Sequence, residues 1–494
     1  MRPFLYTPLL LVTLSLFPTD MQGREKEGIS YLNACIERQV MPLKGNYLRL
    51  SYQENENALY HSPEPWQTLH YDRQGCVTCG EESFYREDTI TRGEQTYVSK
   101  GQYTPNELLI RPYWTEKISN VTETRLLQYP LTVARYSPIL LLNQTRTLST
   151  LSEPEFEDDY AVYRMDLDGK TIQLYIRKEH QLLEKVVTTW SDDMLGDMVE
   201  TISYSDFTTL EGLHYPQNII ISRIHDTQDS ISLGSGEILG KVEPLLQRPE
   251  GYAVEAEIEL EKGVHLEQLS DHIYGVNIPE SESRAFLVEF SDFLVAIDVP
   301  FSSGIGEMVL TEGRRIAPEK PVRYFAFGHH HPWYLGGVRP FIRNGATILC
   351  REENIDYVRF LATAPHSIDP DSLYLSPVPL RTELVDSIMT ISDGEYEMNI
   401  YHIGMKSAHT SDYLLFYFPS EKILIEGDLT WIAAAGPIGK AGARQIALYN
   451  TIRESGLDVE TIFQTWPVSA GNRVKSAFSF SDLEASIPSE SEAK

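Results

Sequence analysis

Residues 324–337, which read Tyr-Phe-Ala-Phe-Gly-His-His-His-Pro-Trp-Tyr-Leu-Gly-Gly, decide the fold of this 494-residue chain. The chain holds only 13 histidines, and three in a row arise by chance in such a chain only about once in a hundred. Two histidines separated by one residue in an extended turn point the same way. His329 and His331 can therefore reach one metal ion, whereas we expect His330 to face solvent or a hydrogen-bond acceptor.

An apolar strand pattern precedes this stretch and a Gly-Gly pair closes it, so that it resembles the metallo-β-lactamase superfamily. That family's motif is an apolar strand followed by His-x-His-x-Asp-His and commonly by two glycines. The resemblance covers roughly residues 264–478. It implies an α+β chain in which an αββα metallo-β-lactamase sandwich at the C-terminus follows a β-rich antiparallel domain.

The resemblance also implies where further metal ligands lie. The family takes its third ligand from a histidine before a small polar residue between two strands, which His409 matches, and a later strand ends in Gly-Asp, which Asp428 matches. We therefore expect His329, His331, His409 and Asp428 at the metal. Asp298, at the end of a buried strand, is expected to accept a hydrogen bond from a metal-bound histidine.

Three other ligand positions of the family have changed in this chain. Trp333 and Tyr334 stand where the family has Asp and His, and Thr465 or Trp466 stands where it has a last His. An indole N–H has no lone pair to offer a metal, and a phenol with a pKa of about 10 is a poor substitute for imidazole. Trp333 and Tyr334 either fill the space of the second metal or form an aromatic wall for a substrate.

A set of three histidines plus water is a competent arrangement for catalytic zinc. The prediction is therefore a metallohydrolase-like protein that binds one zinc ion and hydrolyses an ester, amide or thioester-type bond of an unknown small-molecule substrate. Asp428 would act as the catalytic base or would orient the water. The alternative is a catalytically inactive protein of the same fold that binds a ligand or a partner.

Domain boundaries follow from changes in composition along the chain. Residues 1–23 have a charged start, a short apolar stretch and a polar exit, which predicts a signal peptide and an exported protein, periplasmic or secreted. Residues 24–263 form a β-rich domain, residues 264–478 the metallo-β-lactamase-like domain, and residues 479–494 a solvated polar tail. Part of the β-rich domain, residues 195–216, resembles the curved sheets of lipoprotein-carrier-like domains.

Charge and cysteine content exclude several classes of function. The formal net charge of −29 makes a nucleic-acid partner improbable, because phosphates need a positive surface. No later apolar run reaches the length of about 18 residues that a stable membrane span needs. In an exported protein Cys76 and Cys79, with or without Cys35, are expected to form a disulfide, and Cys350 is expected in the core.

Overall fold

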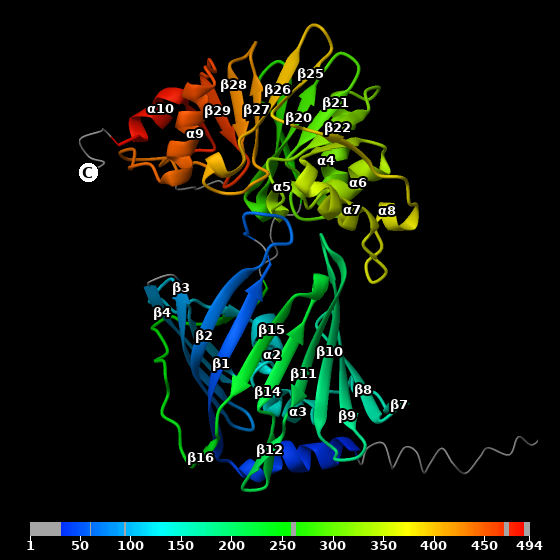
Figure 1. Cartoon of the computed structure of the whole chain (residues 1–494), viewed down its shortest axis with the longest axis vertical. Helices are drawn as coiled ribbons and strands as arrows, with labels where there is room; N and C mark the ends of the chain where they lie inside the picture. Colours follow the sequence, from blue (N-terminus) through cyan, green and yellow to red (C-terminus); the bar gives the residue numbers. More distant parts are fainter. Residues whose placement is uncertain (1–30, 60, 93–94, 258–262, 469–473, 489–494) are drawn as a thin grey trace, which may run out of the picture.

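The computed structural model describes residues 31–59, 61–92, 95–257, 263–468 and 474–488. The chain forms two domains that lie one above the other, each built on β-sheets (Figure 1). The predicted signal peptide, residues 1–23, lies outside the described residues. No helix among the described residues is long and apolar enough to cross a membrane.

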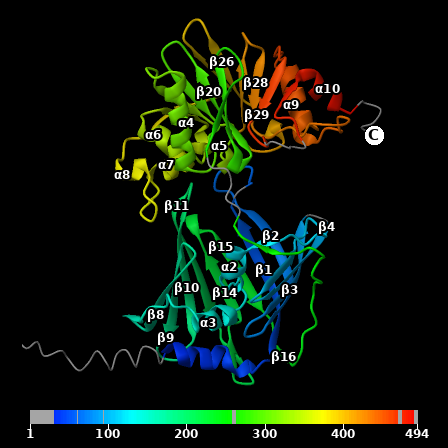
Figure 2. The same cartoon turned by 180° about the vertical axis from the view of Figure 1, so that it is seen from behind.

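The N-terminal domain is built on a large antiparallel sheet that curves around two helices, α2 (Glu123–Val133) and α3 (Ile139–Thr145), with two small two-stranded sheets beside it (Figures 1 and 2). Buried side chains of both helices join those of the strands in a single core. Its strands in spatial order are β5 (Glu107–Arg111), β4 (Gln95–Thr104), β3 (Phe84–Arg92), β2 (Leu69–Cys79), β1 (Tyr47–Ala58), β15 (Gln228–Leu233), β14 (Asn218–Ser222), β11 (Gly196–Ser205), β10 (Leu183–Asp192), β9 (Lys170–Arg177), β8 (Tyr160–Leu167) and β7 (Glu155–Glu157), with β16 (Glu237–Leu239) on β1.

Local sequence explains the pairing of these strands. In β1 exposed and buried residues alternate, so one face of the strand meets the core. Between β8 and β9, Asp168 and Gly169 both have positive φ values, 46° and 75°, as a type I′ turn requires. The β-rich antiparallel domain predicted from such signals is confirmed.

The C-terminal domain consists of two sheets, one of seven strands and one of six. The strands of the first sheet are β18 (His265–Gln268), β19 (Ile273–Ile278), β20 (Ser283–Glu289), β21 (Leu294–Ile297), β22 (Val322–Ala326), β23 (Thr347–Cys350) and β24 (Arg381–Leu384). Those of the second are β25 (Ile388–Ser392), β26 (Glu397–His402), β27 (Leu414–Phe418), β28 (Ile423–Glu426), β29 (Thr461–Gln464) and β30 (Ala477–Ser479).

The two sheets of this domain pack face to face, with helices on both outer faces. Successive residues of one strand point to opposite sides: Phe286 lies in the core between the sheets, whereas Leu287 faces the helices. The outer face of the first sheet meets α4 (Ser303–Ile316), α6 (Val338–Arg343), α7 (Ile355–Thr363) and α8 (Ser372–Leu375), and that of the second meets α9 (Ala443–Glu454) and α10 (Phe480–Ser486). The predicted αββα sandwich is confirmed.

Two expectations are wrong. All four cysteines are free thiols, since Cys76 and Cys79 stand three residues apart on β2 and their side chains point to opposite faces of the sheet. Cys35, the third cysteine considered for this disulfide, instead donates to Gln39. The predicted polar tail also starts too early: residues 480–486 form α10, whose Leu483 is fully buried.

A buried ion pair joins the helices of the first outer face. Burial alone raises the pKa of Asp371, but hydrogen bonds from Arg339, Ser303 and the Tyr374 amide hold that pKa well below its ordinary value. A carboxylate with a depressed pKa in the folded state stabilises the fold above its unfolded pKa, and this contribution is lost as the pH falls.

We therefore expect the free energy of unfolding of the native chain to fall more steeply than that of Asp371→Asn between about pH 5 and pH 3. Urea titrations at several pH values measure this difference. Asp356→Asn, at an exposed position of α7, is the control and should follow the native profile. Parallel profiles for all three proteins would show that Asp371 does not contribute in this way.

Candidate metal centre

The predicted site residues gather at one edge of the sandwich, where buried strands end. His329 and His331 come within five residues after β22, Asp428 follows β28, and Asp298 follows β21. His409 comes from the connection between β26 and β27. The two sheets thus bring together residues that lie about a hundred positions apart in the sequence.

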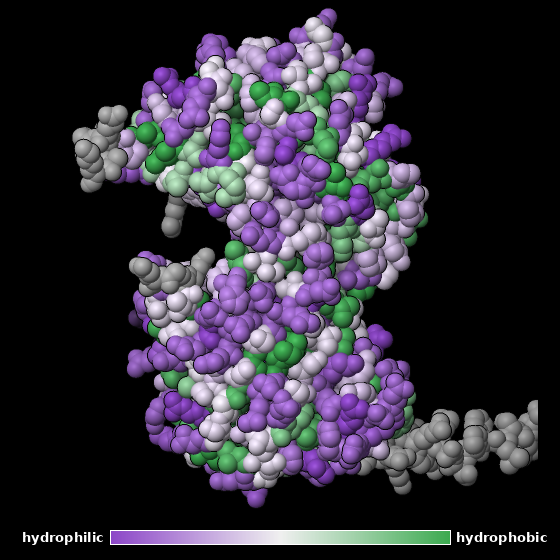
Figure 3. Space-filling view, in the orientation of Figure 1, coloured by the Kyte–Doolittle hydropathy of each residue, from purple (hydrophilic) through white to green (hydrophobic). Residues whose placement is uncertain are grey.

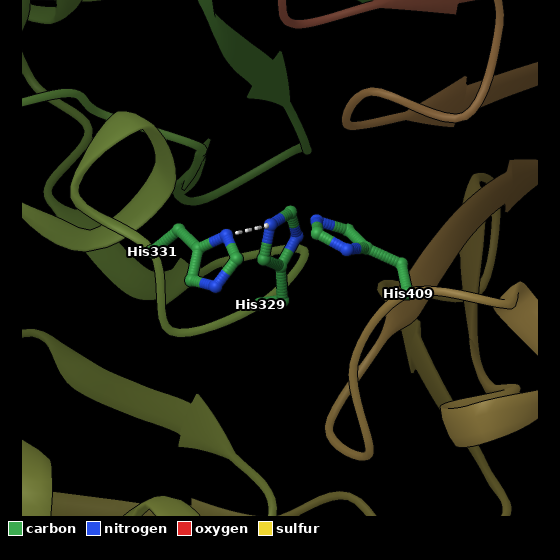
Figure 4. A group of neighbouring side chains, drawn as sticks. All are labelled: His329, His331 and His409. Atoms are coloured by element: carbon green, nitrogen blue, oxygen red, sulfur yellow. Dashed lines mark hydrogen bonds between the residues drawn. The ribbon is translucent and has the colours of Figure 1, made fainter. Parts of the chain in front are cut away.

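Three histidines form the centre of this edge. His329, His331 and His409 are 0%, 1% and 9% exposed, and each offers a ring nitrogen within 4.8 Å of the others. Figure 4 shows the rings of His331 and His409 on either side of His329, with a contact of 3.1 Å between His329 Nε2 and His331 Nδ1. Two ligands of a tetrahedral zinc ion are separated by about 3.3 Å, given a Zn–N distance of about 2.0–2.1 Å.

The chemistry of these histidines fits a metal ion. Burial and the neighbouring histidines lower the pKa of His329 well below its ordinary value and lower the pKa of His331 to about 3. Both rings are therefore neutral, and neutral imidazole is the form that ligates metals. Nδ1 of His329 is buried without a hydrogen-bond partner, and an unpartnered buried polar atom of this kind costs free energy unless something binds it.

Hydrogen bonds fix the loop that carries these histidines. His330 turns away from the other two and pairs with buried Asp412, which accepts from the His330 amide at 2.8 Å and from the Asn354 side chain at 2.8 Å. Asp298 accepts from the Gly328 amide at 2.6 Å and from Thr465 at 2.6 Å. The expectation that Asp298 accepts from a metal-ligating histidine is therefore wrong, because its two partners are a backbone amide and a hydroxyl.

Asp428 lies beside the three histidines. Its Oδ2 is 3.2 Å from Nε2 of His409 and accepts from Nη1 of Arg444 at 3.0 Å, while Oδ1 accepts from the Tyr413 hydroxyl at 3.3 Å. Burial raises the pKa of Asp428, but His409 and Arg444 outweigh burial and lower it below its ordinary value. Asp428 is therefore ionised, and its carboxylate lies next to His409 rather than within the group of three converging nitrogens.

The changed positions of the family motif have two different structural roles. Tyr334 is buried, with its ring 4.0 Å from that of His329, so it fills space beneath the site. Trp333 is only partly buried, 6.0 Å from Trp466, and Trp466 lies 6.3 Å from the half-exposed Trp431. The tryptophans form an aromatic wall beside the histidines, whereas Tyr334 does not.

Sequence reasoning missed two contributors to the site. Arg444 is on α9 and contacts Asp428, and His61 belongs to the loop between β1 and β2 of the N-terminal domain. The His61 ring lies 5.1 Å from the rings of both His331 and Trp333. Partial burial and His409 lower the pKa of His61. Nothing in the residues around it distinguishes a site histidine from one in an ordinary proline-containing turn.

No family model matches the chain, and no curated protein matches it in sequence. Solved structures of metallo-β-lactamases do match. The enzyme from Pontibacter korlensis shares 16% identity over 45% of this chain and 96% of its own, with a TM-score of 0.33. The DIM-1 metallo-β-lactamase shares 13% identity over 48% of this chain and 98% of its own, with a TM-score of 0.34.

A B3 metallo-β-lactamase with an active-site glutamic acid shares 15% identity over 45% of this chain and 86% of its own, with a TM-score of 0.31. The three histidines of the C-terminal domain could hold a metal ion.

Proposed function

We propose that this chain is a metal-dependent hydrolase that uses one zinc ion to cleave an ester, amide or thioester-type bond of a small-molecule substrate. The observation that carries the proposal is the convergence of His329, His331 and His409, all buried, with Nδ1 of His329 left without a hydrogen-bond partner. A buried group of three histidines whose ring nitrogens converge is the arrangement that a zinc ion needs, and Nδ1 of His329 receives no hydrogen bond from the protein.

The chain's own residues would divide the work at this site. Zinc, when bound by three imidazoles, lowers the pKa of a coordinated water to about 7 and polarises a carbonyl. The ionised Asp428 can accept a hydrogen bond from the attacking water and orient it, with Arg444 and Tyr413 holding the carboxylate in place. Trp333 and the neighbouring tryptophans would hold apolar parts of the substrate.

The test is metal analysis of the purified full chain, followed by hydrolysis assays with aryl ester, aryl thioester and β-lactam substrates. We expect close to one zinc ion per chain and turnover of at least one of these classes. Zinc plus iron below about 0.2 per chain after mild preparation would contradict the proposal. That outcome would favour the alternative, a non-catalytic protein that binds a ligand or partner. The aromatic wall of Trp333 and the neighbouring tryptophans would then be its binding surface.

Asp428→Asn tests the role of the carboxylate. We expect kcat to fall by about 100-fold, as for the loss of a positioned proton acceptor, while the zinc content stays near that of the native chain. Steady-state kinetics and metal analysis measure the two effects. Asp458→Asn, an exposed position before β29, is the matched control. Loss of zinc together with activity would instead make Asp428 a metal ligand.

We also propose that the chain is exported to the periplasm or secreted. The support is the charged start, apolar stretch and polar exit of residues 1–23. Mass spectrometry of the mature N-terminus tests this directly, since an exported chain begins after the predicted peptide. An intact N-terminal methionine in the active protein would contradict it.

A further inference from the structure

The loop between β1 and β2, residues 59–68, of which the structure describes 59 and 61–68, contacts the candidate metal centre through Ser62 although it belongs to the N-terminal domain. Nε2 of His331 donates to the Ser62 carbonyl at 3.2 Å, across 269 positions of sequence. A neutral imidazole that donates from Nε2 keeps its lone pair on Nδ1. Nδ1 is the atom of His331 that lies 3.1 Å from His329 Nε2, on the side of the three-histidine group.

This loop is clamped onto the C-terminal domain. The carbonyl of Pro63 accepts from the Ser411 amide at 2.8 Å and from its hydroxyl at 3.1 Å. The Trp66 ring is stacked on His225 and lies 4.8 Å from the ring of Tyr357 on α7. Between the loop and the histidines a cavity of about 20 Å³ remains, which is room for about one water.

The backbone of the loop is strained. His61 and Trp66 both have positive φ values, 54° and 63°, a conformation that costs of order 1–3 kcal/mol for a residue other than glycine. Such conformations persist where the surroundings determine them, and they cluster at functional sites. A loop that only closed the β1–β2 hairpin would need no strain, since Ala58 and Leu69 are direct partners and a two-residue turn joins such a pair.

We infer that the metal centre is a composite of the two domains, in which the loop of residues 59–68 fixes the Nε2–H tautomer and the orientation of His331. The Ser62 carbonyl is the outer partner of this metal ligand, and His61 and Trp66 hold the loop against the site. The inference rests on the proposed function in that it concerns the same site. The N-terminal domain thus helps to build the metal centre. Figure 3 shows the hollow at the junction of the two domains.

The first test uses the metal-free full chain and so does not depend on metal binding. Two-bond ¹H–¹⁵N NMR spectra of histidine-labelled protein report the tautomer of each ring, and a His331→Gln spectrum assigns the His331 signal. We expect the Nε2–H tautomer for His331. We expect this signature to be lost when residues 59–68 are replaced by Asn-Gly, because the Ser62 carbonyl is then gone.

A second variant with smaller changes keeps the inference testable if the chain with the replaced loop misfolds. Trp66→Ala combined with Ser411→Ala leaves every metal ligand and the loop backbone in place but removes part of the clamp. We expect it to weaken zinc binding by about 10-fold or more, the usual effect of disturbing an outer partner of a ligand, because the loosened loop no longer holds the Ser62 carbonyl against His331. Competition with a zinc chelator measures the affinity. Trp114→Ala, which removes an exposed tryptophan of the N-terminal domain, is the control and should bind zinc like the native chain.

The outcomes separate the inference from the proposed function. An Nδ1–H tautomer of His331 in the native chain, or an Nε2–H signature that survives loss of the loop, overturns the inference whether or not zinc binds. Native zinc affinity in the Trp66→Ala/Ser411→Ala variant overturns it as well. If the native chain binds no zinc but shows the expected tautomer and its loss, the proposed function fails and the composite site stands.

Discussion

The His409→Ala variant is expected to lose its zinc and, with it, more than about 1,000-fold of kcat/KM for any substrate that the native chain hydrolyses. Two histidines on one short loop would remain, His329 and His331, and a catalytic zinc site needs three protein ligands. His409 is the ligand that the second sheet contributes. Without it, both remaining histidine ligands come from the first sheet.

Thermal unfolding gives a second measurement of the same change. A ligand that binds only the folded state stabilises it by about 4 kcal/mol when present at 1,000 times its dissociation constant. We therefore expect added zinc to raise the melting temperature of the native chain and to leave that of His409→Ala unchanged. His265→Ala, at an exposed position of β18, is the matched control and should respond like the native chain. A His409→Ala variant that retains one zinc per chain would show that His409 is not a ligand.

The residues that the sequence predicted at this site share a simple physical signal. His329, His331, Asp428 and Asp298 each come shortly after a strand whose last residues are buried, where the chain leaves the core. Polar residues at such ends gather at one edge of the sheets. The resemblance to the metallo-β-lactamase motif was what predicted His409 and Asp428 near His329, and both lie beside it.

The partners of these residues were harder to predict. Asp298 was expected to support a histidine, but its carboxylate caps the turn at Gly328 and bonds to Thr465. Arg444 is in the first turn of α9, and a single arginine on a helix gives no sign in the sequence of which carboxylate it contacts. The choice of hydrogen-bond partner depends on differences in distance of less than an ångström. Sequence patterns do not determine distances on that scale.

The loop of residues 59–68 could not have been predicted at the site at all. Its prolines and serine indicate a turn, and its place between β1 and β2 is a local feature of the N-terminal domain. The contact with His331 arises from how two separately folded sheets dock, through a few residues such as Trp66 and Ser411. Surfaces of this kind carry no periodicity that a single sequence reveals.

The largest loss of stability is expected from Asp412→Ala. This carboxylate is 1% exposed and accepts three hydrogen bonds, from the amide and ring of His330 and from the side chain of Asn354. Removing one partner of a buried charged network leaves the others unpaired in the interior, which costs about 3–5 kcal/mol. Urea unfolding of the full chain measures the loss, and Asp458→Ala at the surface should change the free energy of unfolding little.

Asp412→Asn distinguishes the loss of charge from the loss of shape. The amide retains the volume and one acceptor oxygen, but its NH₂ group must face either the His330 amide or the Asn354 side chain, both of which are donors. We therefore expect a free energy of unfolding between those of the native chain and Asp412→Ala. If Asp412→Asn were as stable as the native chain, a charged acceptor would not be needed to hold the histidine loop. The loop would then depend on packing alone, and Asp412→Ala should cost no more than the loss of a few buried atoms.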